Sequence, residues 1–313
     1  MQITTASFSG HESFPFRNAW LTKGVVACAE DPTIFSKETA MVDLGVGKNM
    51  VQSVRHWCLA TRMLEEDSNT KNNRGRHLLP TDIGKKLFLT NGGWDPYLED
   101  AATLWLIHWL LVTNGEKATT WYYTFNILNR PDFTRRSLEE AIDGFVRRMA
   151  LKSPTHDTLR RDVDIFVRTY AGTRPSSDKM IEDSLDCPLA ELGLIYENAS
   201  EGQLAFTRGP KDTLPNAVMV YAISDYASRK FGQRTLTFEE LAYGPLGPGR
   251  VFRLDEASLA ERLDSLTEVT NDAWQFAETA GYKQVLLTKD IDPIAILEDY
   301  YRQRFGSRTG EAM

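Results

Sequence analysis

The sequence has little cysteine and no long hydrophobic run. Its three cysteines, Cys28, Cys58 and Cys187, show no paired spacing, so neither a disulfide framework nor a zinc knuckle is predicted and a reducing cytosol is favoured. The most apolar run, residues 101–112, is shorter than the roughly 20 residues of a membrane span and contains His108. The N-terminus lacks a basic-then-apolar leader. We therefore expect a cytoplasmic protein without membrane association.

Sequence motifs for common organic cofactors are missing as well. Residues 45–48 (GVGK) suggest a phosphate loop, but that motif needs glycine where Val42 stands and serine or threonine where Asn49 stands. The glycines between 244 and 249 do not follow dinucleotide spacing, and no His-Glu-x-x-His motif or nucleophile elbow occurs. No cofactor can therefore be argued from these motifs.

Positive charge is concentrated in one segment of an acidic chain. The whole sequence carries a net charge of −7, which argues against a general binder of polyanions. Residues 45–86 contain eight basic and four acidic side chains, a net charge of +4, so the remainder carries −11. This asymmetry is typical of a basic docking face on an otherwise acidic protein.

The basic segment contains a predicted helix-turn-helix. Residues 36–44 are expected to form a helix that ends at 45–47 (GVG), and residues 48–59 begin a second helix. Met50, Val54, Trp57 and Cys58 have helical spacing on one face. The side chains on the other face are of types that contact phosphates and base edges: Lys48, Asn49, Gln52, Arg55 and His56.

A wing is predicted after these helices. Residues 71–76 are polar and basic and include Arg74 and Arg76, and residues 77–88 are expected to form a strand and the start of a further helix. Together with the two helices, this order predicts a winged helix that contacts DNA. The alternative is a winged helix used only for packing or for binding protein.

The rest of the chain is predicted to be mostly helical. Helices are expected at 98–111 and 137–149, and residues 172–177 are the best candidate linker. A second winged helix is predicted from helices at 214–228, 237–242 and 255–266 and a hairpin at 274–278 and 282–287. The helix at 255–266 is acidic and is therefore expected to contact protein. The predicted fold is thus mostly α, with tandem winged helices: a DNA-binding domain with its N-terminal segment at 1–90, a helical domain at 91–175 and a C-terminal winged-helix-like domain at 176–313.

Two sequence sites carry candidate catalytic side chains. His11 and Glu12 lie in an aromatic setting, and Asp95, Glu99 and Asp100 are clustered near a predicted helix start. Asp95 and Glu99 are spaced one helical turn apart and are candidates to share a divalent ion, Mg²⁺ or Mn²⁺, of the kind that assists phosphodiester cleavage. The alternative is structural, because acidic side chains near a helix start also cap free amide groups.

Six motifs in order resemble one family over nearly the full length. They are FSGHESF (8–14), LGVGKNMV (44–51), WDPYLED (94–100), TWYY (120–123), CPL (187–189) and PGRVF (248–252). The resemblance is to the bacterial domain-of-unknown-function family 4007. It implies an association with phosphosulfate-reductase-like genes and with DNA phosphorothioation in antiviral defence, and the Ssp-type branch includes a similar DNA-nicking component.

These observations predict a DNA-binding component of a phosphorothioation system that nicks DNA for sulfur incorporation. The expected partners are double-stranded DNA and the sulfur-transfer and ATPase proteins of the same system, and a homodimer is also considered. One alternative is a non-catalytic adaptor or a transcriptional regulator of that system. Another is a protein-interaction scaffold that does not contact DNA.

Overall fold

Helices form most of the structure, and small sheets accompany them. The computed structural model describes residues 3–171, 187–198, 202–230, 232–279 and 281–306. Within these ranges the strands form one two-stranded and two three-stranded sheets. The fold is therefore mixed α and β, where the sequence predicted a mostly helical protein.

The N-terminal part combines four helices with one hairpin. Its elements are α1 (Trp20–Glu30), α2 (Ala40–Leu44), α3 (Lys48–Ala60), β1 (Leu64–Glu66), β2 (Leu78–Pro80) and α4 (Asp82–Phe88). Helix α2 is shorter than the helix predicted over 36–44. Before it, the Asp31 carboxylate accepts hydrogen bonds from the backbone N–H and the hydroxyl of Thr33 and pairs with Lys37. Residues Ile34–Ser36 form a short 3-10 helix between these contacts, and Lys37 after it is extended, so α2 starts later than predicted.

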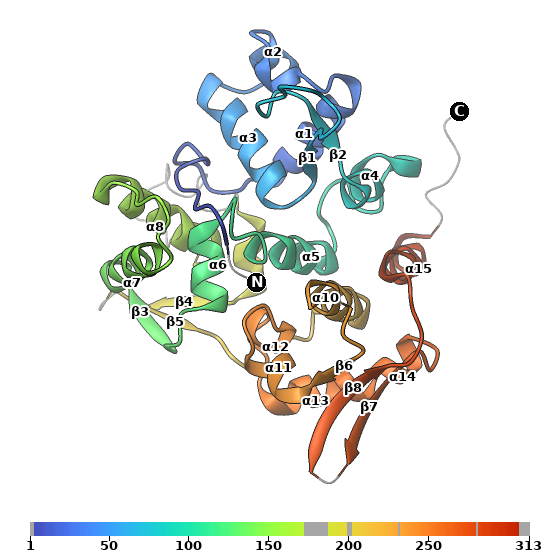
Figure 1. The fold of residues 1–313 in the computed structure, drawn as a ribbon. Coiled ribbons are helices and arrows are strands. Elements are labelled where there is room, and N and C mark those ends of the chain that lie inside the picture. The colour runs from blue at the N-terminus through green and yellow to red at the C-terminus, as the bar shows by residue number, and fades with distance from the viewer. Residues whose placement is uncertain (1–2, 172–186, 199–201, 231, 280, 307–313) are drawn as a thin grey trace.

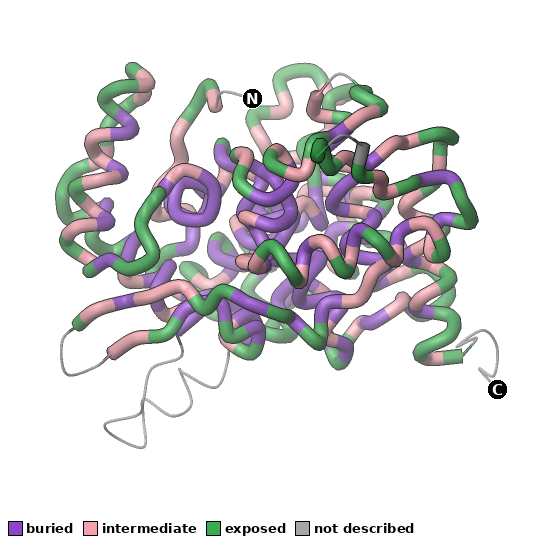
Figure 2. Tube along the Cα trace, turned by 90° about the horizontal axis from the view of Figure 1, so that it is seen from below, coloured by how far each residue is buried: buried purple, intermediate pink, exposed green. Residues whose placement is uncertain are grey.

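Helix α5 (Ala101–Val112) is the centre of the molecule (Figure 1). Every residue from Ala102 to Val112 is buried, as expected for a helix that is apolar all round. Figure 2 shows buried residues gathered in the interior, with exposed residues along the outside. The helix begins three residues after the predicted start at 98. Leu98 has a φ of 56°, which a right-handed helix cannot accommodate, and Asp100 caps the helix by accepting from the Ala102 N–H.

A three-stranded sheet joins the middle of the chain to its later part. This region contains α6 (Thr119–Asn126), β3 (Asp132–Thr134), α7 (Arg135–Arg148), α8 (His156–Tyr170), β4 (Ile195–Asn198) and β5 (Gln203–Phe206). Strand β5 lies between β3 and β4 and is antiparallel to both. The sheet thus combines strands from both sides of the predicted boundary near residue 175, and that boundary itself lies outside the described residues.

The C-terminal part repeats a pattern of helices followed by a hairpin. Its elements are α10 (Asn216–Arg229), β6 (Thr235–Thr237), α11 (Phe238–Tyr243), α12 (Pro248–Val251), α13 (Glu256–Asp264), α14 (Leu266–Val269), β7 (Trp274–Thr279), β8 (Tyr282–Leu287) and α15 (Pro293–Phe305). The predicted hairpin is confirmed, with Phe276 opposite Val285. Helix α15 then packs back on α10.

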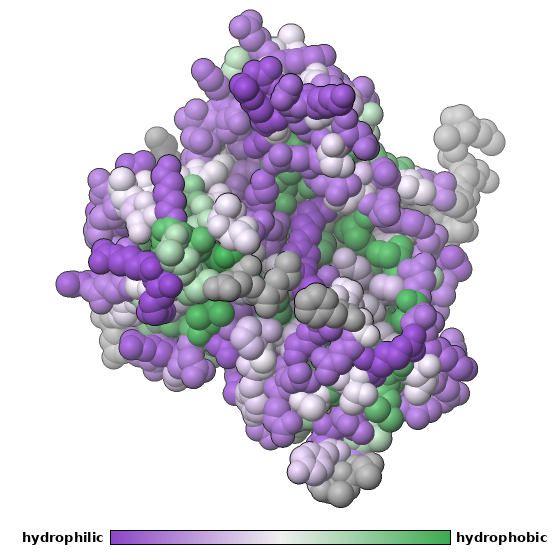
Figure 3. Space-filling view, viewed as in Figure 1, coloured by the Kyte–Doolittle hydropathy of each residue, from purple (hydrophilic) through white to green (hydrophobic). Residues whose placement is uncertain are grey.

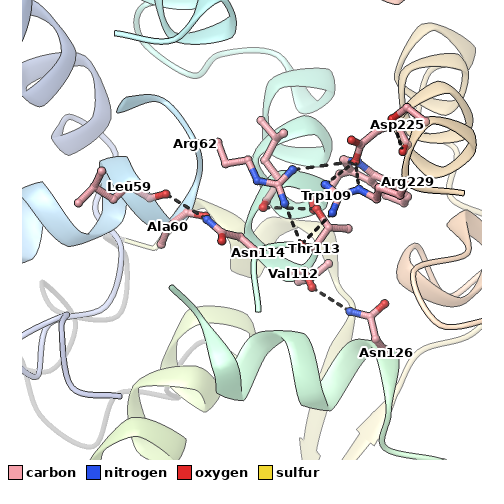
Figure 4. A network of polar contacts seen from close by, with 12 residues as sticks. Leu59, Ala60, Arg62, Trp109, Val112, Thr113, Asn114, Asn126, Asp225 and Arg229 are labelled. Atoms are coloured by element: carbon pink, nitrogen blue, oxygen red, sulfur yellow. Dashed lines mark hydrogen bonds and ion pairs between the residues drawn. The ribbon is translucent and has the colours of Figure 1, made fainter. Parts of the chain in front are cut away.

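The C-terminal end of α5 is a polar junction between these parts (Figure 4). The Thr113 carbonyl accepts from Arg62, at 2.8 Å, and from Arg229, at 3.5 Å. The Asp225 carboxylate lies 2.9 Å from Arg229 and also accepts from the Trp109 indole. The Asn114 amide donates to the carbonyls at the end of α3.

A membrane-spanning segment is not found in the described part of the chain. None of its helices is both long and apolar enough to cross a bilayer.

Gly84 provides a test of the packing of α4 against Met63, the residue directly before β1. A Cβ atom at this position would lie 2.2 Å from the Met63 carbonyl oxygen, whereas a Cβ at Gly144 on α7 would meet only the flexible end of Arg148, at 3.3 Å. We expect Gly84→Ala to lower the free energy of unfolding by about 1–3 kcal/mol. Gly144→Ala should leave it unchanged or raise it by up to about 1 kcal/mol. Urea unfolding measures both, and equal effects would contradict this packing.

Candidate nucleic-acid interface

Helix α3 presents a short exposed polar face. Gly45 ends α2 in the left-handed region, with a φ of 64°, and α3 starts three residues later. Val51, Val54 and Trp57 are buried on the side that packs toward α1. The side chains of Lys48, Asn49 and Gln52 are exposed on the first two turns.

Arg55 connects this helix to the basic loop between β1 and β2. Its Nη2 donates to the Gly75 carbonyl at 2.9 Å. Burial lowers the pKa of this guanidinium, and the nearby Glu66 carboxylate partly offsets the effect. Arg55 is therefore engaged in holding the loop, whereas the sequence had placed it among the groups facing DNA.

The loop itself exposes three cations. The Asn73 amide donates to the carbonyls of Asp67 and His77 and accepts from the His77 N–H, which closes the loop. Lys71, Arg74 and Arg76 are exposed. Neither they nor Lys48 forms an ion pair with any described carboxylate. Figure 3 shows strongly hydrophilic side chains gathered over this end of the molecule, where Figure 1 labels α2 and α3.

His56 lies beneath a turn formed by residues 9–14, called the N-terminal turn below. It does not extend the exposed face of α3. A Cβ at Gly10 would lie 2.3 Å from the His56 ring, and the Nε2 atom of His56 is buried without a hydrogen-bond partner among the described residues. Burial, followed by the neighbouring His11, lowers the pKa of His56 to about 3. Its ring is thus neutral at physiological pH and covered on one side, so the predicted phosphate-contacting role is not supported by its position.

His11 is held inside the N-terminal turn by Asp162 of α8. The Asp162 carboxylate accepts from His11 Nε2 at 2.8 Å, from the Ser9 N–H at 2.7 Å and from the Thr120 hydroxyl at 2.5 Å. His11 Nδ1 accepts from the Ser13 N–H at 3.1 Å, so Nε2 carries the ring proton. Both ring nitrogens are therefore engaged, and the side chain is only 1% exposed.

The turn that carries His11 has an unusual backbone. Ser9, Glu12 and Ser13 all have positive φ, at 64°, 49° and 63°. Such conformations cost free energy in residues other than glycine and must be held by surrounding contacts. The Ser53 hydroxyl of α3 supplies one of these by donating to the His11 carbonyl at 2.9 Å. The exposed Glu12 side chain is thereby placed on a turn bound to α3.

Asp95 and Asp100 serve as buried acceptors around the start of α5. Asp95 accepts from the N–H groups of Glu99 and Asp100 and, at 2.6 Å, from the Thr103 hydroxyl. Asp100 accepts from the Ala102 N–H, from the Tyr300 hydroxyl and from Arg304. Both are buried, while the Glu99 side chain is exposed.

These contacts do not create a ready set of metal ligands. Both oxygens of Asp95 already accept hydrogen bonds, so this carboxylate has a structural role whether or not it binds an ion. In the ranges that the structure describes, no three His, Cys, Asp or Glu side chains are grouped to hold a metal ion. The predicted pair of Asp95 and Glu99 is smaller than such a group, so a Mg²⁺ or Mn²⁺ ion shared by these two side chains stays a prediction.

Asp162 is the site residue that the sequence reasoning missed. Its spacing in the sequence could have revealed it, because Asp162 shares the buried face of α8 with the apolar Leu159, Val163 and Phe166. A carboxylate on an apolar helical stripe requires a polar partner, and here that partner is the N-terminal turn.

Comparisons with known proteins identify the family. The family model described as "Protein of unknown function (DUF4007)" matches residues 8–301. The chain belongs to this family. Two solved structures are similar over 98% of this chain and 90% of their own, each at 30% identity. They are an SspB crystal structure, with a TM-score of 0.83, and a magnesium ion-bound SspB crystal structure, with a TM-score of 0.84. No curated protein matches.

The family predicted from the sequence motifs is thus confirmed, and the SspB neighbours agree with the Ssp-type branch. The magnesium ion is a property of the solved neighbour.

Asp95 gives a test between a structural and a catalytic carboxylate. Asp95→Ala removes the acceptor of two N–H groups and one buried hydroxyl, so we expect it to lower the free energy of unfolding by about 2–4 kcal/mol. Glu99→Gln, at an exposed side chain, should change it by less than about 1 kcal/mol. Chemical denaturation measures both. Full stability of the Asp95 variant would show that this carboxylate does not hold residues 95–103 in place.

Proposed function

We propose that this protein is a DNA-binding component of a bacterial phosphorothioation system. The family and the SspB neighbours support the system, and the exposed surface of α3 supports the DNA contact. The single observation that supports the contact is that α3 and the β1–β2 loop, whose exposed cations form no ion pair with a described carboxylate, are joined to each other. Arg55 joins α3, with Lys48 at its start, to the loop that exposes Arg74 and Arg76.

A winged-helix interpretation fits the order of the N-terminal elements. Helix α2, the turn at Gly45–Gly47 and helix α3 precede the β1–β2 hairpin, whose loop corresponds to a wing. In this interpretation the first two turns of α3 enter a major groove, where Asn49 and Gln52 contact base edges. The loop cations contact phosphates beside the groove. His56 is left out because the N-terminal turn covers it.

The C-terminal half has a different surface and, in this proposal, a protein partner. Helices α13 and α14 expose four acidic side chains, Glu256, Glu261, Asp264 and Glu268. Negative side chains repel the phosphate backbone, so these helices are unsuited to a groove. We assign them to a basic surface on a sulfur-transfer or ATPase protein of the same system.

Salt dependence provides the direct test of the DNA contact. If Lys48 and Arg76 each neutralise one phosphate, replacing both by Ala should reduce the slope of log affinity against log salt by roughly 1.8. The measurement is fluorescence anisotropy with a labelled duplex at several salt concentrations. Lys283→Ala with Lys289→Ala makes the same charge change at exposed positions near the β7–β8 hairpin. Equal slopes in the two double variants would disprove the α3 surface as the contact.

Strand nicking is the second candidate function. The resemblance to the Ssp-type branch suggests it, and Glu12 is the specific observation in its favour, because it is an exposed carboxylate on a strained turn attached to α3. In nicking, a water molecule forms a bond to phosphorus, one ester P–O bond breaks, and the leaving oxygen takes up a proton. A carboxylate beside the bound strand can accept the proton that the water loses.

A plasmid assay separates nicking from adaptor function. We expect purified protein to convert supercoiled plasmid to the open circle, tested with and without Mg²⁺ or Mn²⁺, and Glu12→Gln to slow conversion by at least 100-fold while duplex affinity is retained. Glu30→Gln, at another exposed carboxylate, is the control. Wild-type protein that binds duplex but never nicks it would favour the adaptor or regulator, and an active Glu12 variant would remove Glu12 from the reaction.

A further inference from the structure

Four arginines line one cleft on the side of the molecule between α6, β5 and the α11–α12 pair. They are Arg130, Arg208, Arg250 and Arg253, and the cleft has a volume of about 250 Å³. None of the four forms an ion pair with a described carboxylate. The nearest negative charges lie at the rim, where Asp255 acts on Arg208 and Glu256 accepts from the Tyr243 hydroxyl. Like charges brought together in this way repel one another, so the arrangement is costly unless something negative occupies the cleft.

The two inner arginines are held in place by backbone carbonyls. Arg253 donates through Nη2 to the carbonyls of Thr124 and Phe125, at 3.0 and 3.2 Å. Its guanidinium lies 3.5 Å from the centre of the Phe206 ring. Arg250 donates to the carbonyls of Tyr243 and Leu128. These contacts fix the position of both side chains but supply no full negative charge.

Burial makes the missing counter-charge significant. Desolvation, followed by repulsion from Arg250 and Arg208, lowers the pKa of Arg253 to about 9, and burial also lowers the pKa of Arg250. The Nε atoms of both residues are buried without a hydrogen-bond partner among the described residues. A protein that maintains two partly desolvated cations without a carboxylate has a site suited to an external anion.

Size and lining narrow the class of anion. The volume of about 250 Å³ lies just below the range of small-molecule pockets, about 300–1,000 Å³. It leaves room for more than a simple inorganic ion but not for a duplex. The rim carries the aromatic side chain of Tyr243, which is 42% exposed. A guanidinium group can donate two parallel hydrogen bonds to two phosphate oxygens, and nucleobases stack on aromatic side chains.

We propose that this arginine cleft binds the phosphate group of a single nucleotide. In this site Arg250 and Arg253 lie at the inner end, and the exposed Arg130 and Arg208 contact the phosphate from the rim. Arg208 is placed there by its bond to the Leu254 carbonyl and by the Tyr243 ring, 5.4 Å from its guanidinium. The nucleotide is either free or the phosphorylated end of a DNA strand, since both present the same chemistry. The site is built from different elements than the α3 surface and does not depend on the DNA contact proposed above.

Calorimetry on the full chain tests the cleft with defined probes. We expect 5′-AMP to bind and adenosine, which lacks the phosphate, not to bind. Arg130→Gln with Arg208→Gln alters exposed side chains, so folding should be retained, and it should weaken 5′-AMP binding at least tenfold. Arg136→Gln with Arg147→Gln removes the same charge from exposed positions on α7 and should bind like wild type. The Lys48→Ala, Arg76→Ala variant should also bind 5′-AMP normally, which separates this site from the α3 surface.

Two short single-stranded oligonucleotides, with and without a 5′-phosphate, distinguish the two sources of the phosphate group, a free nucleotide and a DNA strand end. Tighter binding of the phosphorylated oligonucleotide than of 5′-AMP identifies a strand end, and the reverse identifies a free nucleotide. The proposal is overturned if neither binds at millimolar concentration or if adenosine binds as well as 5′-AMP. Unchanged affinity in the Arg130, Arg208 variant, or preference for a glutamate-rich peptide, would also overturn it.

Discussion

The carbonyl groups that α5 leaves open at its C-terminal end organise the whole molecule. A helix end that is buried needs donors from elsewhere, and here two of them are arginines from distant parts of the chain. Arg62, after α3, and Arg229, at the end of α10, both donate to the Thr113 carbonyl (Figure 4). Burial, followed by the neighbouring Arg229, lowers the pKa of Arg62 to about 10. Asp225 offsets that repulsion, which makes it the group on which the junction depends.

The same junction positions the proposed DNA contact. Asn114, directly after α5, donates to the carbonyls of Leu59 and Ala60 and thereby fixes the last turn of α3. On its other side α3 is bound to the N-terminal turn through Ser53. The exposed Lys48, Asn49 and Gln52 therefore lie on a helix that is held at its middle, by Ser53, and at its last turn. Such support keeps a binding surface rigid.

Local patterns predicted the elements well and the roles of single side chains less well. The exposed Lys48, Asn49 and Gln52 and the β7–β8 hairpin follow from helical and strand periodicity, which depend on neighbouring residues alone. The positions of Arg55 and His56 depend on Gly75 and Gly10, which are distant in sequence, so helical spacing could not reveal that they are engaged. The carboxylates at Asp95 and Asp100 were ambiguous for another reason, since capping and metal binding use the same side chain near the same helix end. The arginine cleft draws on three separate stretches of the chain and has no local pattern at all.

The pairing of β3 with β5 bears on how such a chain can change over generations. The register sets Phe133 opposite Leu204 and Asp132 opposite Ala205, although the two strands are about seventy residues apart in sequence. Recombination between them would join a β3 from one ancestor to a β5 from another, and the two strands would pair as they do here only if their buried faces matched. The buried side of Phe133 and Leu204 would have to be inherited together. The middle and the later part of this chain are therefore expected to vary as a linked pair, and not as modules that can be exchanged freely.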